Sequence, residues 1–161
     1  MRTPKIYLET TIFNFPFADD APQYKADTLK LFEEIREGKF KSYTSGYVIQ
    51  ELEAATDTLR ENRLQLIDEY DIDVIPINDE AERLANLYIE EGVIRAKYGT
   101  DATHIAVATI AGLDFIVSLN FKHIVKRKTK VETRLINIRE GYGHIDIHTP
   151  AEVIEHENED I

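Results

Sequence analysis

Four oxygen-bearing side chains stand at the ends of predicted strands or at the starts and faces of predicted helices: Glu9, Glu51, Asp101 and Asn120. Apolar residues bracket each of them and are expected to fix its backbone in a core. Carboxylate and amide oxygens are the ligands that hard cations such as Mg²⁺ and Mn²⁺ prefer. If the four side chains converge, the sequence predicts a divalent-metal site suited to the hydrolysis of a phosphodiester.

Each of these residues also has an ordinary structural explanation. Glu9 fits a cap or turn residue after a strand, and Asp101 fits a helix N-cap. Glu51 fits a surface glutamate, and its neighbour Glu53 is the acid that we expect to lie outside the site. The prediction therefore depends on the ordered set and not on any single residue.

The elements that must position these residues alternate between strand-like and helix-like patterns. Short runs typical of strands cover residues 5–9, 40–44, 73–77, 114–118 and 144–147. Segments with apolar residues at helical spacing cover 23–39, 45–55, 58–70, 78–91 and 101–111, with Ser45 and Asn78 as expected N-caps. This order predicts a three-layer α/β/α sandwich with a mostly parallel central sheet. Sites in such sheets form beyond the carboxyl ends of the strands, where Glu9 and Asn120 are expected.

Length and composition predict one soluble domain. The chain has 161 residues, which suits a single domain over residues 1–149 and an acidic C-terminal tail over 150–161. It has no cysteine, which excludes disulfides and thiolate zinc sites. No apolar run approaches the roughly 20 residues that span a bilayer, so we expect no membrane association and a cytoplasmic location.

Charge is unevenly distributed along the chain. The formal net charge of −11 argues against a broad electrostatic grip on nucleic acid. A local basic segment nevertheless follows Asn120, and its side chains are predicted to contact RNA phosphates: Lys122, Lys126, Arg127 and Lys128. The alternative is that this segment is ordinary solvated surface.

Several neighbours of the four site residues have two interpretations. Thr10 and Thr11 suit groups that orient a water or a ligand carboxylate, or plain turn residues. His104 lies three residues after Asp101 and is expected to be a hydrogen-bonded packing residue. The predicted loop over residues 10–22 holds three aromatic residues that suit either base stacking or a hydrophobic lid or oligomer contact: Phe13, Phe15 and Phe17.

Four segments, in this order, resemble the motifs of PIN domain nucleases. Residues 6–11 (IYLETT) resemble the opening strand and its acid, and residues 48–52 (VIQEL) resemble the second acidic motif. Residues 101–108 (DATHIAVA) resemble the third, and 114–124 (DFIVSLNFKHI) resemble the fourth strand and the site residue after it. The resemblance implies Mg²⁺- or Mn²⁺-dependent cleavage of RNA. It also implies a toxin of a toxin–antitoxin pair, an antitoxin that inserts an arginine or lysine among the acids, and a homodimer with the aromatic loop and the helix over 81–88 as contacts.

Two positions depart from the family pattern. The first acid is usually aspartate and is Glu9 here, while the fourth position is often aspartate and is Asn120 here. These departures keep open an alternative, a catalytically weakened PIN-like domain that binds RNA or a protein without cleavage. A phosphatase is less well supported, because Glu9-Thr10-Thr11 lacks an Asp-x-Asp arrangement. A Rossmann cofactor domain is poorly supported, because no Gly-x-Gly-x-x-Gly follows a strand.

Overall fold

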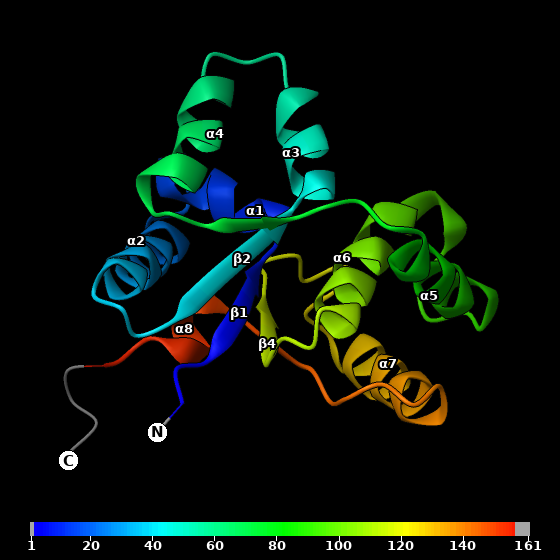
Figure 1. The fold of residues 1–161 in the computed structure, drawn as a ribbon. Helices are drawn as coiled ribbons and strands as arrows, with labels where there is room; N and C mark the ends of the chain where they lie inside the picture. The colour runs from blue at the N-terminus through cyan, green and yellow to red at the C-terminus, as the bar shows by residue number, and fades with distance from the viewer. Residues whose placement is uncertain (1, 157–161) are drawn as a thin grey trace.

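A five-stranded parallel sheet forms the centre of the protein (Figure 1). The computed structural model describes residues 2–156. The strands are β1 (Lys5–Leu8), β2 (Lys41–Ser45), β3 (Asp73–Ile75), β4 (Phe115–Val117) and β5 (Asp146–His148), in the spatial order β3-β2-β1-β4-β5. Every neighbouring pair is parallel. The predicted α/β/α sandwich with a parallel sheet is confirmed.

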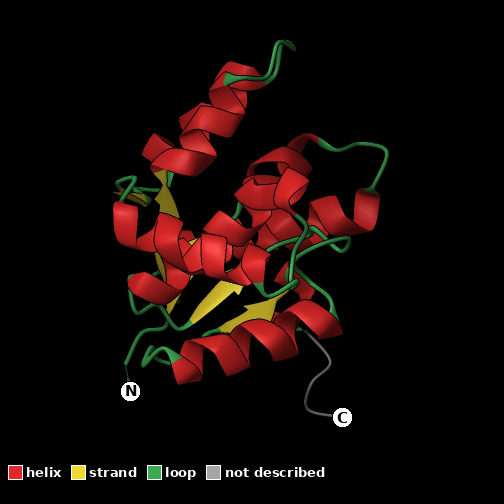
Figure 2. Ribbon diagram, turned by 90° about the vertical axis from the view of Figure 1, so that its right-hand side faces the viewer, coloured by secondary structure: helices red, strands yellow, loops and turns green. Residues whose placement is uncertain are grey.

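Helices cover both faces of this sheet, as the turned view of Figure 2 also shows. Two of them, α2 (Pro22–Arg36) and α8 (Pro150–Val153), lie together on one side. On the other side lie α5 (Asp79–Glu90), α6 (Gly99–Ile110) and α7 (Arg127–Arg139). The remaining helices are α1 (Thr10–Asn14), α3 (Gly46–Glu53) and α4 (Arg60–Glu69), with short 3₁₀ turns η1 (Phe15–Phe17) and η2 (Ala96–Tyr98).

Local sequence explains how several helices begin. The Ser45 hydroxyl accepts a hydrogen bond from the Val48 amide and caps α3. The Asn78 side chain accepts one from the Ala81 amide at 2.8 Å and caps α5. Both predicted caps are therefore confirmed.

The central strand β1 is the most deeply buried part of the chain. Tyr7 pairs with Tyr43 of β2 on one side and with Ile116 of β4 on the other. Ile6, Tyr7 and Leu8 are all fully buried. A strand flanked on both edges and both faces leaves its carboxyl end as the place where the chain next meets solvent.

The structure corrects three expectations about the N-terminal half and α5. The predicted loop over 10–22 is in fact α1 and η1. Phe13 is fully buried and packs on Phe32 at 6.2 Å between ring centroids, so it is neither a lid nor a stacking surface. On α2, the core face is formed by Leu31, Phe32 and Ile35, whereas Leu29 is 45% exposed.

The apolar face of α5 is not available as a dimer contact, although other residues of this helix are exposed. Its apolar residues are buried within the same chain, where α5 packs on α6: Ala81, Leu84, Ala85 and Tyr88. A surface that is already covered inside the protomer is closed to a second copy. The homodimer itself stays a prediction.

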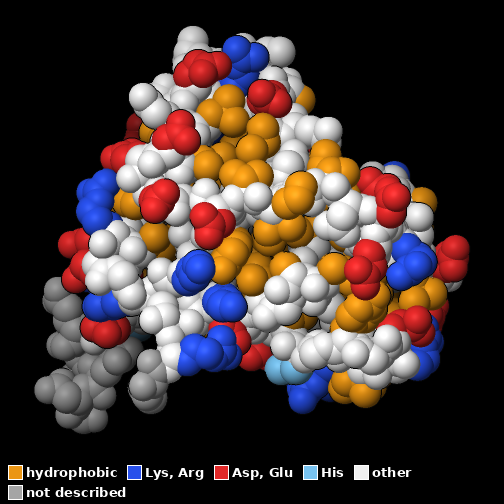
Figure 3. Space-filling view, viewed as in Figure 1, with side chains coloured by type: hydrophobic (Ala, Val, Ile, Leu, Met, Phe, Trp, Pro, Cys, Tyr) orange, Lys and Arg blue, Asp and Glu red, His pale blue; other side chains and the backbone are white. Residues whose placement is uncertain are grey.

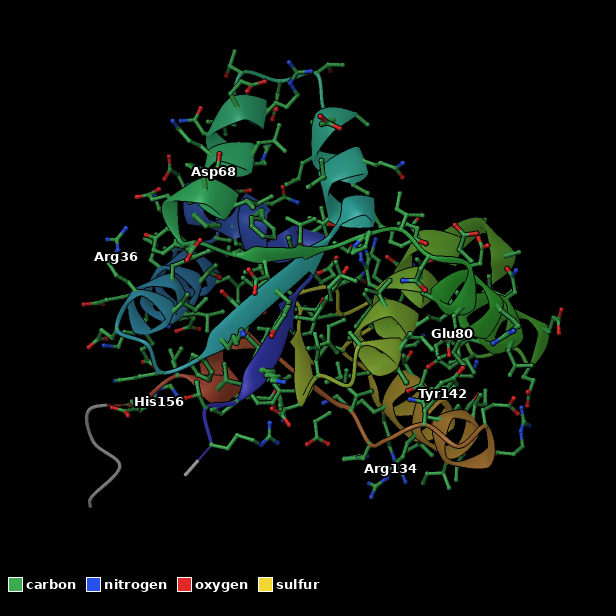
Figure 4. The ribbon with its side chains drawn as sticks, in the orientation of Figure 1. Arg36, Asp68, Glu80, Arg134, Tyr142 and His156 are labelled. Carbon is green, nitrogen blue, oxygen red and sulfur yellow. The ribbon has the colours of Figure 1, made fainter. Side chains whose placement is uncertain are left out.

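The basic segment after Asn120 forms the loop before α7 and the first turns of α7. Helix α7 is held against α5 at its far end, where the Arg139 guanidinium pairs with Glu91 just past α5. The Tyr142 hydroxyl donates to Glu80 at 3.2 Å, and both residues are labelled in Figure 4.

No helix within residues 2–156 is both long and apolar enough to cross a bilayer.

The segment predicted as an acidic tail begins with structure. Residues 150–153 form α8, and Pro150 and Ile154 are buried against the domain. The backbone N–H of Glu155 donates to Glu34 of α2 at 3.1 Å. Residues 157–161 of the predicted tail lie outside the described part of the chain.

Candidate functional site

The two central strands of the sheet end at the same place. The chain leaves β1 towards α1 on one side, and it leaves β4 towards α7 on the other. This reversal of strand order is where α/β sheets open a crevice for ligands. Glu9 directly follows β1, and Ser118 and Asn120 follow β4.

Glu9 is held rigidly at this point. Its Oε1 accepts hydrogen bonds from the Thr11 amide at 3.2 Å, the Thr11 hydroxyl at 2.5 Å and the Ser118 hydroxyl at 2.7 Å. The residue is only 3% exposed. Its second oxygen, Oε2, takes part in no hydrogen bond with the described residues. Glu9 is thus both the N-cap of α1 and a carboxylate with one oxygen left for a ligand.

Glu51 reaches the same place from α3. Its Oε1 accepts a hydrogen bond from the Thr10 hydroxyl at 2.6 Å and lies 2.5 Å from His104 Nε2. Thr10 and Thr11 therefore each hold one of the two glutamates, as expected for groups that orient ligands. Glu53 is exposed, two residues further along the same helix.

His104 connects the acids to the core. It is fully buried, and its Nδ1 lies 2.7 Å from the Tyr7 hydroxyl, which is itself 2.7 Å from Ser45 Oγ. The expected hydrogen-bonded packing role is confirmed. The histidine does more than pack, however, because its other nitrogen fixes the position of Glu51.

Asp101 stands one turn before His104 on α6. It lies in the first turn of a helix that begins at Gly99, so it is not the N-cap. The Asn120 amide lies beside it, while the Asn120 carbonyl oxygen accepts a hydrogen bond from the His123 amide at 3.1 Å. The Asn120 side-chain oxygen thereby closes the turn that follows β4. An aspartate at position 120 would face Asp101 as a like charge, whereas the neutral amide does not.

The charge of His104 influences the pKa values of all three carboxylates. Burial lowers the pKa of His104, but the hydrogen bond and charge of Glu51 and the charges of Glu9 and Asp101 outweigh it, so the pKa is raised. Burial raises the pKa of Glu51, but the hydrogen bond and charge of His104 and the hydrogen bond from Thr10 outweigh burial, so the pKa is lowered. Burial raises the pKa of Glu9 and of Asp101, and their hydrogen bonds and the His104 charge only partly oppose it.

The basic residues are less uniformly placed than the acids. Lys122, Lys126 and Arg127 are exposed. Lys128 has a partner within the protein, since its ammonium donates a hydrogen bond to the Gly92 carbonyl at 2.6 Å. Asp114 lies at the opposite end of the sheet, where it accepts a hydrogen bond from the Lys5 amide.

The donor set fits a hard divalent cation by its chemistry. Glu9, Glu51 and Asp101 offer oxygens at one edge of the sheet, and Oε2 of both glutamates is free of the hydrogen bonds that hold Oε1. Across residues 2–156, no three His, Asp or Glu side chains already stand close enough to enclose an ion. Binding a metal therefore requires these carboxylates to turn towards it.

A hollow of about 710 Å³ opens beside Glu51, between α3, α5 and α6. Its lining includes neutral hydrogen-bonding side chains, among them Gln50, Asn86 and Thr103. Glu51 is therefore reachable from an open groove, which neither Glu9 nor Asp101 lines.

Sequence reasoning missed three members of this network: Tyr7, Ser45 and Ser118. Tyr7 lies in a continuous apolar run, which predicts an ordinary core residue, although a buried tyrosine hydroxyl needs a hydrogen-bond partner. Ser118 gave a signal, since a serine ending a buried strand must bond to something, and it bonds to Glu9.

The chain matches no protein-family model and no curated protein. The resemblance to PIN domains therefore rests on the order of the sequence motifs alone.

The raised pKa values of Glu9 and Asp101 predict how the metal-free protein responds to pH. The folded state holds these protons to higher pH than the unfolded chain, so the free energy of unfolding falls as pH rises above about 4–4.5 and through the folded pKa values. The variant Glu9→Gln keeps an oxygen for Thr11 and Ser118 and removes the charge. We expect thermal unfolding in EDTA to show a higher Tm for Glu9→Gln than for wild type at pH 8, by a few degrees, since about 1 kcal/mol moves Tm by roughly 2–4 °C at this length.

The two proteins should differ less at pH 5, where the wild-type carboxyls retain more of their protons. Glu53→Gln serves as the control, because this exposed acid should leave the pH dependence unchanged. Parallel curves for Glu9→Gln and wild type would mean that Glu9 carries no buried charge.

Proposed function

We propose that this protein is a divalent-metal-dependent endoribonuclease of the PIN type. The observation that supports it is the hydrogen-bonded network that joins the ends of β1 and β4 to α3 and α6. In it, Glu9 is tied to Ser118, Glu51 is tied to His104, and Asp101 stands one turn from His104 beside Asn120. Four segments distant in sequence thus bring three carboxylates to the crevice of the sheet.

The chain's own residues have distinct roles in this proposal. Glu9, Glu51 and Asp101 hold Mg²⁺ or Mn²⁺, which when bound supplies an acidified water and polarises the scissile phosphate. Thr10 and Thr11 keep one oxygen of each glutamate engaged, so that the other faces the ligand. Asn120 holds Asp101, and its amide adds no charge to a site whose three acids give a formal −3.

One divalent ion suits this charge better than two. A single Mg²⁺ or Mn²⁺ leaves the site at about −1, while two ions leave it at about +1 until a phosphate arrives. A second ion would then enter together with the substrate. The lowered pKa of Glu51 keeps that carboxylate ionised at neutral pH, ready to bind a cation.

A second candidate is a PIN-like domain that binds RNA or a protein without cleavage. Two observations favour it. Oε1 of Glu51 is already engaged by His104, and the burial that raises the pKa of Glu9 disfavours the charged form that a metal needs. A toxin role, an antitoxin partner, a homodimer and a cytoplasmic location stay predictions from the sequence.

Mn²⁺ binding measured by calorimetry is the first test. Wild type is expected to bind Mn²⁺, and Asp101→Ala to lose at least about tenfold in affinity, because one of three carboxylates is gone. Glu53→Ala is the matched control and should bind as wild type does. Absence of binding to the wild type at millimolar Mn²⁺, with or without an RNA oligonucleotide, would favour the non-cleaving candidate.

A further inference from the structure

Two exposed aromatic rings lie next to the acidic site. Phe121 directly follows Asn120 and is 44% exposed, and Tyr24 near the start of α2 is 42% exposed. Their ring centroids are 5.6 Å apart with a tilt of 37°. Phe15 supports Tyr24 edge-on at 5.7 Å, so the pair is braced from below while its outer faces meet solvent.

A second aromatic pair involves His123, three residues after Asn120. His123 stacks on Tyr98 at 3.8 Å between ring centroids, and the Lys97 ammonium lies 5.1 Å above the Tyr98 ring. The His123 amide donates to the Asn120 side chain, which ties this pair to the site. Two aromatic contacts therefore begin within three residues after Asn120, one through Phe121 and one through His123.

The net charge of the protein bears on how these rings could contribute to RNA binding. A chain with a net charge of −11 and three carboxylates at its centre repels phosphates. Figure 3 shows Lys and Arg side chains interspersed with Asp and Glu on the face it displays. Lys128, the fourth residue of the predicted phosphate track, is occupied by the Gly92 carbonyl. The net charge therefore limits what phosphate contacts contribute and favours contacts of another kind.

Base stacking supplies such contacts. Stacking of an unpaired base on an aromatic side chain contributes about 1–3 kcal/mol, and it is insensitive to base identity. Bases inside a duplex are closed to it, because both of their faces are already stacked. Exposed Lys122, next to Phe121, offers a cation for one phosphate of the same strand.

We propose that Tyr24 and Phe121 form a platform on which an unpaired nucleobase of a single-stranded RNA stacks, and that this platform contributes more to RNA affinity than the basic residues of the loop and α7. The proposal rests on the proposed function for the identity of the strand. It adds the residues that select an unpaired strand and place it beside Glu9, Glu51 and Asp101.

The test measures binding of a fluorescein-labelled 12-nucleotide single strand by anisotropy in EDTA, where no cleavage occurs. Tyr24→Leu and Phe121→Leu are each expected to weaken binding about tenfold, since each 1.4 kcal/mol is a factor of ten. Tyr24→Phe and Phe121→Tyr keep a ring and should bind as wild type does. This rescue separates stacking from a loss of fold, which the Tm of each variant monitors.

Two further arms sharpen the result. Lys126→Ala with Arg127→Ala should change affinity less than either Leu variant and reduce the slope of log affinity against log salt by about 0.7 per lost contact. A series of single strands, each with one abasic site at a different position, should identify the stacked base. At that position the missing base weakens binding to wild type, and it causes no further loss of affinity in Phe121→Leu, which already lacks the ring.

The outcomes distinguish this proposal from the proposed function. Leu variants that bind like wild type, or a duplex that binds as tightly as the single strand, would overturn the platform even if the protein cleaves RNA. Platform-dependent binding with no cleavage in Mg²⁺ or Mn²⁺ would overturn the nuclease and keep the platform. Failure of wild type to bind any single strand in EDTA would overturn the platform, and only failure to cleave RNA in Mg²⁺ or Mn²⁺ would overturn the nuclease.

Discussion

Glu51→Gln is expected to lower the rate of metal-dependent RNA cleavage by roughly 10²–10³-fold. A metal that polarises the phosphate and acidifies water contributes several kcal/mol to catalysis, and about 1.4 kcal/mol is a factor of ten in rate. Glutamine keeps an oxygen to accept the hydrogen bonds from Thr10 and His104, so the network that holds α3 persists. It replaces the free oxygen with an amide nitrogen that cannot bind a cation.

The measurement is single-turnover cleavage of a labelled single-stranded RNA in Mn²⁺, with Tm recorded for each variant. Glu53→Gln makes the same chemical change two residues away on the exposed side of α3, and it should cleave at the wild-type rate. If high Mn²⁺ restores the rate of Glu51→Gln, the lost carboxylate contributes affinity for the ion. A rate within about twofold of wild type at low Mn²⁺ would remove Glu51 from the site.

The positions of the acids were predictable because each follows from a local pattern. Glu9 ends a continuous apolar run, and such a run in an α/β order is a buried parallel strand whose carboxyl end meets the crevice. Asn120 follows a second run of the same kind. Their convergence then required only that β1 and β4 be neighbours, and they are.

The network behind the acids was not predictable, because its contacts join residues far apart in sequence. Tyr7 and His104 are 97 residues apart, and His104 and Glu51 are 53 apart. Nothing local to Tyr7 indicates which polar group its hydroxyl will meet. Only the register of β1 against β2 and the docking of α6 on the sheet decide this.

The buried face of helix α7 was not predictable either, for a different reason. Its buried residues are Ile136 and three polar ones, Thr129, Thr133 and Asn137, while the apolar Val131, Leu135 and Ile138 are exposed. The buried hydroxyls satisfy themselves locally, as when Thr133 donates to the Thr129 carbonyl at 2.6 Å.

Asn137 completes the polar face of α7 with contacts to α5 and α6. It accepts a hydrogen bond from Tyr88 at 2.5 Å and donates one to Thr109 at 3.3 Å. Polar partners on α5 and α6 therefore determine which face of α7 is buried. Hydrophobic periodicity alone would predict a different face.

His104→Leu is expected to destabilise the protein by about 2–3 kcal/mol and to weaken Mn²⁺ binding by roughly 10–100-fold. Removing one partner of a buried hydrogen-bonded pair costs roughly 3–5 kcal/mol. The loss here is smaller, because the Glu51 side chain is 36% exposed and keeps Thr10, and the Tyr7 hydroxyl keeps Ser45. Leucine fills a similar volume, so the change tests the hydrogen bonds and not a cavity. At this chain length the loss lowers Tm by roughly 4–12 °C.

His104→Gln separates positioning of Glu51 from general stability. Its amide nitrogen can replace Nε2 as the donor to Glu51, while the contact of Nδ1 with Tyr7 is lost. We expect His104→Gln to recover most of the Mn²⁺ affinity and only part of the Tm, because groups that orient a metal ligand contribute about 10–100-fold to affinity. Calorimetry and thermal unfolding on the same samples give both values. If the two variants lose Mn²⁺ affinity equally, His104 stabilises the core without positioning Glu51, and the carboxylate is then held by Thr10 alone.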